Sequence, residues 1–160
     1  MIKELMGNNE KAASLAADGF FLSSVMFISK APSAPPDSSM INFYSNKKNE
    51  LASFSADQGR LSFSGLSPPV KETEIRPLDL ARVSMGREEV MKECASKSAG
   101  SLISRIVLVL RTSSNASGGA GPCWHVNIFL KDLHILTIVF DAENGEELLS
   151  TKTKLFGNPQ

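Results

Sequence analysis

The chain has 160 residues, of which 42% are hydrophobic and 21% charged, and its 17 basic and 17 acidic side chains cancel at pH 7. Residues 1–80 carry 8 basic and 9 acidic side chains and residues 81–160 carry 9 and 8, so neither half is a basic arm or an acidic tail. This balance excludes the charge pattern of a nucleic-acid binder, and no apolar run approaches the roughly 18 residues of a membrane span. The composition is typical of a soluble globular chain that forms one ordinary domain or two very small ones.

The N-terminal residues and the cysteines predict a cytoplasmic protein. Residues 1–10 lack the continuous apolar stretch of a secretory signal, because polar and acidic residues such as Glu4 interrupt it. Cys94 and Cys123 could form one bridge, but a cytoplasmic chain of this size does not need it. We therefore expect both cysteines to be reduced and structural.

The first half of the chain predicts a helix followed by strands. Residues 8–18 contain a capping asparagine and good helix formers, and Gly19 ends the helix. Residues 20–29 are rich in aromatic and β-branched side chains and predict a strand, whereas the prolines of residues 31–37 predict a connection. The further strands expected in this half are residues 40–44, 50–54 and 61–63, the last two joined by a turn at 57–59.

A Pro-rich linker over residues 67–76 separates this half from a second one that repeats the same order of elements. The second half starts with a helix over residues 87–98, which places Val90, Met91 and Cys94 on one face. The strands expected after it are residues 102–111, 124–130, 134–140 and 147–149, with a loop over 112–122 and a turn at 143–145.

Three residues of the first half recur in the second at a constant spacing of 86 residues. The pairs are Phe54 with Phe140, Ala56 with Ala142 and Gly59 with Gly145. The repeat predicts an α+β architecture of two tandem helix-plus-antiparallel-sheet units, residues 1–66 and 77–160. Because units this small bury little apolar surface alone, we expect their sheets to pack together or to align edge to edge. The alternative is a single α+β meander whose turns use similar residues.

The last hairpin of the second half reads Phe140-Asp141-Ala142, with Gly145 and Leu148 following. With the helix and strands before it, this hairpin resembles that of PepSY or PepSY-like domains, whose pattern is Val-Asp-Ala-x-x-Gly-x-Val/Leu. Asp141, Ala142, Gly145 and Leu148 match or nearly match that pattern, and Phe140 stands where the family usually has valine. On physical grounds Asp141 can accept turn amides and Gly145 can supply a positive φ.

The first half resembles the family less well, since Ser55 replaces the aspartate and only Ala56 and Gly59 remain. The resemblance covers about 60 residues per copy and implies a helix packed on a small antiparallel sheet, in a cystatin-like topology. It implies no common catalytic residues, and it implies roles in inhibiting peptidases or in regulation by binding.

Cys123, His125 and His134 are the residues that come nearest to a metal site or a nucleophile pair. Cys123 and His125 are two apart on a strand and should share a face, and a turn could bring His134 within reach. A structural zinc site needs four ligands, and no CxxC or HxxxH pair supplies the others. No signature of a catalytic cysteine surrounds Cys123. We expect core packing here and neither a metal nor a nucleophile.

Two further segments resemble ligand-binding motifs, a calcium loop and a phosphate loop, but each lacks part of the motif. The acidic turn, which contains Asp141, Glu143, Glu146 and Glu147, departs from the EF-hand pattern after Gly145, so a solvated turn is expected. Residues 117–121 are rich in glycine but lack the Gly-Lys-Ser/Thr ending of a phosphate loop, and a strand follows them, so a hairpin connection is expected. The apolar run of residues 26–28 predicts a strand covered on both faces or a subunit contact.

These observations lead to a functional hypothesis without a reaction centre. We expect no catalytic, cofactor-binding or metal-binding residues. We expect instead a non-enzymatic protein-binding or regulatory module that resembles a peptidase inhibitor and presents sheet edges or loops to another protein. The alternative is a cone-shaped α+β pocket protein or enzyme of the cystatin or NTF2-like kind, recognisable by a deep apolar cavity lined by Trp124, His125 or Asp141. A subunit of a homo-oligomer is a third class. Neither nucleic acid nor a membrane is an expected partner.

Overall fold

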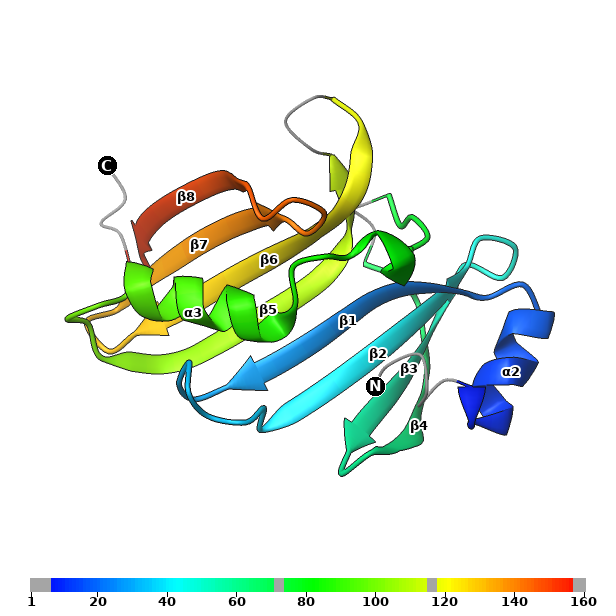
Figure 1. Cartoon of the computed structure of the whole chain (residues 1–160). Helices are drawn as coiled ribbons and strands as arrows, with labels where there is room; N and C mark the ends of the chain where they lie inside the picture. The colour runs from blue at the N-terminus through cyan, green and yellow to red at the C-terminus, as the bar shows by residue number, and fades with distance from the viewer. Residues whose placement is uncertain (1–6, 71–73, 115–117, 157–160) are drawn as a thin grey trace.

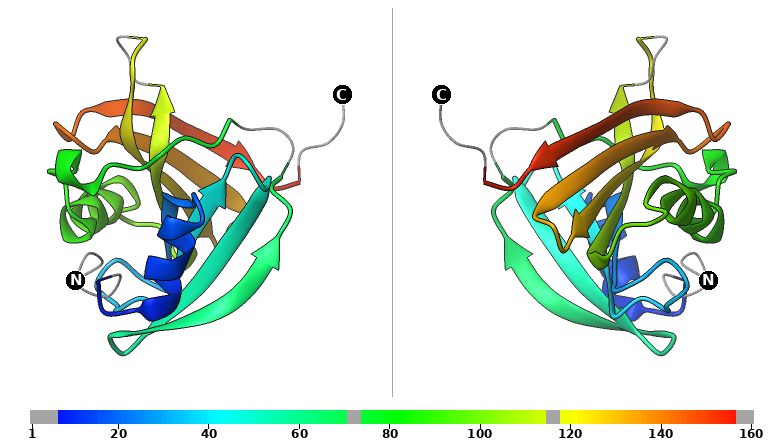
Figure 2. Two further views of the ribbon diagram at one scale, coloured as in Figure 1. Left: turned by 90° about the vertical axis from the view of Figure 1, so that its right-hand side faces the viewer. Right: turned by 90° about the vertical axis from the view of Figure 1, so that its left-hand side faces the viewer.

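The computed structural model describes residues 7–70, 74–114 and 118–156. Eight strands form one antiparallel sheet in the order β4-β3-β2-β1-β5-β6-β7-β8, and the helices α2 and α3 pack against it (Figure 1). The α+β class expected from the sequence is confirmed. The sheet is strongly curved (Figure 2).

The first half contributes α2 and the strands β1 to β4. Their bounds are α2 Glu10–Ala17, β1 Phe21–Ser29, β2 Ser38–Ser45, β3 Glu50–Asp57 and β4 Arg60–Ser67. Asn9 caps α2, because its side chain accepts a hydrogen bond from the Ala12 amide at 3.1 Å. Gly19 follows the helix with a φ of 81°, a backbone conformation that glycine adopts without strain.

The second half contributes a 3-10 turn, α3 and the strands β5 to β8. Their bounds are η1 Leu80–Arg82, α3 Arg87–Lys97, β5 Ile103–Ser114, β6 Ala120–Leu130, β7 His134–Asp141 and β8 Glu147–Lys154. The buried face of α3 consists of Val90, Met91 and Cys94, as the sequence predicts. The Glu89 side chain accepts the Gly86 amide at 2.7 Å and fixes the start of this helix.

The two halves join edge to edge, which is one of the two expected arrangements. β1 pairs with β5 from Ser24 opposite Arg111 to Ser29 opposite Ile106, so the sheet runs without a break through the middle of the molecule. The guanidinium of Arg87 on α3 reinforces this seam on the helix side. It donates to Ser29 Oγ at 3.0 Å and to the Ala34 carbonyl at 3.3 Å.

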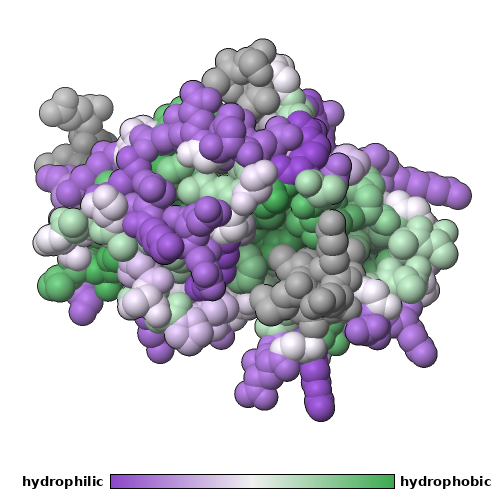
Figure 3. All heavy atoms as spheres, in the orientation of Figure 1, coloured by the Kyte–Doolittle hydropathy of each residue, from purple (hydrophilic) through white to green (hydrophobic). Residues whose placement is uncertain are grey.

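One hydrophobic core spans both halves of the sheet. Strand alternation directs one set of side chains toward the helices. The largest of these that are fully buried include Val25, Ile41, Phe54, Leu108, Val126, Ile138 and Phe140. On this side of the molecule hydrophilic residues dominate over α3, and hydrophobic residues reach the surface between α3 and α2 (Figure 3). The two helices therefore cover this face in two separate patches.

Several strands are longer than the sequence predicts. Pro122 was expected in a loop over residues 112–122, but it lies inside β6 opposite Thr112. A proline has no amide hydrogen to donate. The Pro122 carbonyl nevertheless accepts a hydrogen bond from the Ala142 amide at 2.9 Å, so the residue still takes part in backbone hydrogen bonding. The strands β4 and β8 likewise extend beyond their predicted ends because they pair along β3 and β7.

The predicted linker and the loop around 115–117 are described only in part. Ser67 belongs to β4 and not to the linker, and residues 71–73 and 115–117 lie outside the described residues. Pro77 and Leu78, which follow the linker, are bonded to the sheet through the Thr112 hydroxyl at 2.6 Å and the Leu22 carbonyl at 2.8 Å. The connection between the halves is thus attached to the strands that it crosses.

The turn between β7 and β8 has the chemistry expected from its sequence. Asp141 Oδ1 accepts the Glu143 amide at 2.8 Å, and the Asp141 carbonyl accepts the Gly145 amide at 2.8 Å. Gly145 has a φ of 78°. This left-handed conformation is strained for any residue with a Cβ atom.

Replacing Gly145 with alanine should therefore lower the free energy of unfolding by about 1–2 kcal/mol. Gly7→Ala is the matched control, because Gly7 has no positive φ and a Cβ there meets nothing within 4 Å. Urea unfolding of both variants measures the difference. Equal stabilities of the two variants would contradict the strain assigned to this turn.

Candidate functional site

The face of the sheet opposite the helices is the candidate functional surface. The register aligns rows of side chains across it, and one row runs from Met26 through Val109 and His125 to Val139. Met26, Val109 and His125 are only partly buried. Since no described helix covers this face, it is called the open face below.

A cavity lies on the open face where the connection between the halves leaves β4. Its volume is about 360 Å³. Its wall on the sheet side is contributed by β1, β2, β3 and β5, and its other wall by residues 70 and 74–76. The polar side chains on the sheet side are Ser23, Ser24, Asn42, Thr112, Ser113 and Ser114. The cavity therefore lies at the seam between the two halves.

The polar part of this cavity is organised by hydrogen bonds between strands. Asn42 Nδ2 donates to Ser24 Oγ at 3.1 Å, and Ser53 Oγ donates to Asn42 Oδ1 at 2.7 Å. The apolar side chains of the lining are Leu51, Val70, Ile75 and Val109. Hydroxyl, amide and apolar groups are thus combined in one small space, as in many ligand sites.

Arg111 is the unpaired charge of this lining. The second arginine, Arg76, forms an ion pair with Glu74 on its own segment at 2.8 Å. Arg111 Nε is buried without a hydrogen-bond partner, and no described acidic side chain pairs with its guanidinium. The lining carries one positive charge without a neighbouring negative one.

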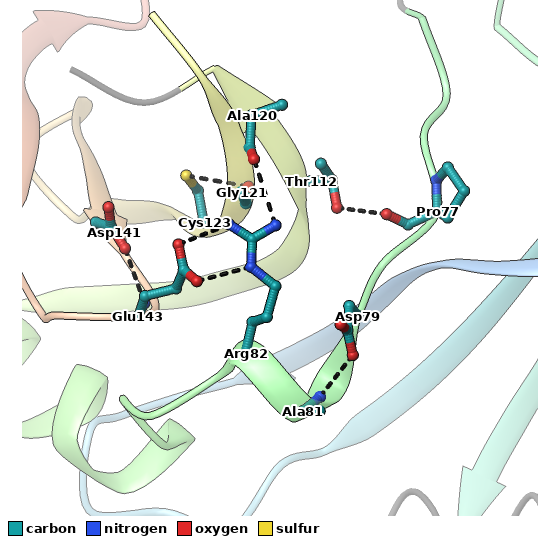
Figure 4. A network of polar contacts seen from close by, with 10 residues as sticks. All are labelled: Pro77, Asp79, Ala81, Arg82, Thr112, Ala120, Gly121, Cys123, Asp141 and Glu143. Carbon is teal, nitrogen blue, oxygen red and sulfur yellow. Dashed lines mark hydrogen bonds and ion pairs between the residues drawn. The ribbon is translucent and has the colours of Figure 1, made fainter. Parts of the chain in front are cut away.

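A separate polar network holds the connection against β6 and β7 (Figure 4). Arg82 of η1 donates to both carboxylate oxygens of Glu143, at 2.7 and 2.9 Å, and to the Ala120 carbonyl at 3.5 Å. The hydrogen bond and charge of Glu143 raise the pKa of Arg82 above its ordinary value. The pair bridges elements 61 residues apart in sequence, so its role is to position the connection.

The structure places Cys123 and His125 on one face and His134 on the other. His125 is opposite Val139, whereas His134 starts β7 with Lys154 as its partner on β8. Strand alternation puts residue 134 on the opposite face from residue 139. The expectation that a turn brings His134 within reach is therefore wrong, and the described residues contain no group of three or more metal-binding side chains.

Cys123 and His125 do not bond to each other, because each contacts a different group. Cys123 Sγ donates to the Gly121 carbonyl at 3.6 Å, and His125 Nε2 lies 3.1 Å from Ser113 Oγ. Burial raises the pKa of the Cys123 thiol, which disfavours the thiolate. Cys94 is a free and fully buried thiol whose pKa burial raises to about 12. Within the described residues this geometry does not pair a thiolate with a base.

The acidic turn and the glycine-rich segment have structural roles. Asp141 caps its own turn, Glu143 pairs with Arg82, and Glu147 pairs with Lys97. Of the four acidic side chains of this turn, Glu143 and Glu147 are thus paired with a basic side chain of the chain. Of the glycine-rich residues, 118 and 119 precede β6, and residue 117 lies outside the described residues. Ala120 and Gly121 were expected in the hairpin connection but lie inside β6, opposite Ser114 and Ser113.

Trp124, His125 and Asp141, the residues expected to line a deep apolar cavity, do not line the cavity on the open face. Trp124 faces the core, where its Nε1 donates to the Met85 carbonyl at 2.8 Å. His125 and Asp141 are also absent from the cavity wall, although Ser113 links the wall to His125. Sequence reasoning missed Arg111 and Asn42. An arginine two residues beyond Val109 on one strand face was the available signal for Arg111.

Comparison with known proteins adds a likeness in fold. No family model matches the chain, and none of the curated proteins is similar to it. Among solved structures, the chain is similar to the crystal structure of a "putative lipoprotein" from Clostridium difficile 630, with 10% identity, a TM-score of 0.55 and 89% of each chain covered. At this identity the likeness shows the fold alone. None of the helices in the described part of the chain is long and apolar enough to cross a membrane.

The environment of His125 predicts a dependence of stability on pH. Burial, and then the charge of Arg111, lower the pKa of its imidazole from 6.5 to about 4. Between pH 6.5 and 4 the unfolded chain binds a proton on this side chain and the folded chain does not. The free energy of unfolding therefore falls as the pH is lowered through this window.

An NMR titration of the His125 ring should give a midpoint near 4. In urea unfolding at pH 7 and pH 5, His125→Gln should lose less stability on acidification than the unmodified protein. A ring that titrates at its ordinary pKa, near 6.5, would mean that His125 is solvated and would contradict this description.

Proposed function

We propose that this chain is a non-enzymatic binding module that holds another protein on the open face of its sheet. The observation that carries the proposal is the central row of that face, where Met26 and Val109 are partly buried apolar side chains without a covering helix among the described elements. An apolar stretch of sheet that no helix covers is favourable for association. The predicted cover on both faces of residues 26–28 would then come from the partner.

The edge strand β4 supports the same proposal. Its only charged residue is Arg60, and it exposes 42% of Phe63 and 54% of Leu66. An edge strand of this kind is open to pairing with a further strand, whereas β8 carries Lys152 and Lys154, which oppose it. A partner segment that adds to β4 would continue onto the open face.

The regulatory and inhibitor-like roles implied by the PepSY resemblance fit this proposal. An inhibitor needs a preformed binding surface and no reactive group of its own. The hydrogen bonds of Cys123 and His125 to other groups favour a binding role over catalysis. A pocket protein is the second candidate, favoured by the cavity of about 360 Å³ under the connection. Cytoplasmic location remains a prediction from the sequence.

Site-specific photo-crosslinking in the native cell tests the proposal. A benzophenone amino acid replaces Met26 on the open face, and the control places it at Lys92, an exposed residue of α3 on the helix side. We expect adducts with a second polypeptide species from position 26 and not from position 92. Equal yields, no adducts, or adducts only with another copy of the chain would contradict the proposal, and the last would favour a homo-oligomer.

We also propose that the halves are duplicated PepSY-like units, residues 1–66 and 77–160 with a linker at 67–76. Within the described ranges, each half has one α-helix followed by four strands in chain order. Gly59 and Gly145, which stand 86 positions apart, have φ values of 77° and 78° in the corresponding turns. These similarities support a common origin without a close sequence match.

If the units are equivalent, Gly59→Ala should destabilise the protein to an extent similar to Gly145→Ala. Both glycines have the same left-handed backbone, and a Cβ at either position meets no atom closer than 4.0 Å. Urea unfolding of the two variants measures the costs. A Gly59 variant as stable as the unmodified protein would argue against equivalent turns.

A further inference from the structure

The cavity on the open face contains a charge that no described side chain balances. Its lining includes Arg76, Arg111 and Glu74 as charged residues. Glu74 is engaged by Arg76 at 2.8 Å, and this contact lowers the pKa of Glu74. Arg111 forms no ion pair with any acidic side chain of the described residues.

The placement of Arg111 makes it an unusual residue for a solvent-facing role. It lies on β5 in the central part of the sheet, between Ser24 on β1 and Cys123 on β6. Its Nε is buried without an acceptor, which costs free energy relative to a solvated or bonded group. The terminal nitrogens of the guanidinium have no described partner either, and Arg111 lines the cavity, so they are the donors that a ligand can reach.

The other side chains of the lining limit the ligand class. Ser24, Asn42 and Ser113 offer hydroxyl and amide groups, and Leu51, Ile75 and Val109 offer apolar contact. One uncompensated positive charge suits a monoanion better than a phosphate dianion, which usually binds several cations or a row of backbone amides. The apolar wall suits a ligand with a short hydrocarbon part.

We propose that this cavity is a binding site for an organic carboxylate, held by the terminal nitrogens of Arg111. A carboxylate matches the fork of a guanidinium and forms paired hydrogen bonds with it. The bound negative charge would offset the unbalanced arginine, and the apolar part of the ligand would rest on Leu51, Ile75 and Val109. This site goes beyond the proposed function, because it can be filled whether or not a protein occupies the open face.

Two kinds of ligand could supply this carboxylate group: a small carboxylic acid, or a peptide through its C-terminus. The test titrates the ¹⁵N-labelled protein and follows the Arg111 Nε–Hε resonance, assigned by its loss in Arg111→Gln. The probes are hexanoate with hexanamide as its neutral match, an acetylated Ala-Ala-Val peptide with a free or an amidated C-terminus, and inorganic phosphate. The two pairs separate the sources, since each has its own uncharged control.

We expect hexanoate, the free peptide acid, or both to shift the Arg111 resonance to saturation, together with the amides of Ser24 and Ser113. Arg111→Gln should weaken binding about tenfold or more, as the loss of a charge-assisted hydrogen bond predicts. Arg105→Gln is the matched control. Arg105 lies on the same strand, six residues before Arg111 and outside the cavity, and its loss should leave the affinity unchanged.

A second readout does not depend on how well the variant folds. Because the charge of Arg111 contributes to the lowered pKa of His125, the bound free peptide acid, whose α-carboxyl has a pKa of about 3.3–3.7, should raise the midpoint of the His125 ring titration in the unmodified protein. The proposal is overturned if no carboxylate shifts the Arg111 resonance, if the amides bind as well as the acids, or if phosphate binds as tightly. Success of this test with a failed crosslinking experiment would leave the carboxylate site standing and remove the protein-binding face.

Discussion

The pairing of β1 with β5 is the interaction on which the rest of the structure depends. This ladder joins two groups of four strands into one sheet from Ser24 opposite Arg111 to Ser29 opposite Ile106. Since side chains alternate along each strand, the register of this one pair decides which residues of both halves share a face. A shift by one residue would pair Phe27 with Val107 or Val109 in place of Leu108, so that the core residues of one half would share a face with the open-face residues of the other.

The two faces created by this register have different chemistry. The helix side collects large apolar side chains in one continuous core, and α2 and α3 cover it in two places. The open face mixes apolar, hydroxyl and amide side chains, which neither form a dry core nor make a fully solvated surface. The connection between the halves adds a wall at the seam, so the same arrangement that unites the sheet also forms the cavity beside Arg111.

Local sequence patterns predicted the order and type of the elements well. Asn9 and Gly19 delimit α2, and Asp141 and Gly145 form their turn as expected, because these effects act over a few residues. Pro122 was misplaced, since its tolerance inside β6 depends on which of its backbone groups the neighbouring strand uses.

The candidate site was harder to predict, because it arises from pairing between distant strands. The sequence shows that Cys123 and His125 share a face, but only the register shows that His134 lies on the other one. Arg111 stands at the end of an apolar run, and nothing near it in sequence indicates Ser24 or Asn42 as neighbours across the seam. The path of the connection, which completes the cavity, follows from hydrogen bonds at Pro77 and Leu78.

Hydrogen exchange of the β1 amides tests the union of the two halves most directly. In residues 24–29 alternate amides point toward β5. The ladder predicts that they exchange as slowly as the amides that point toward β2 and far more slowly than the outward amides of the edge strands β4 and β8. Exchange at the rate of an edge strand would show that β1 has no partner on that side and would contradict a single sheet with one covered and one open face.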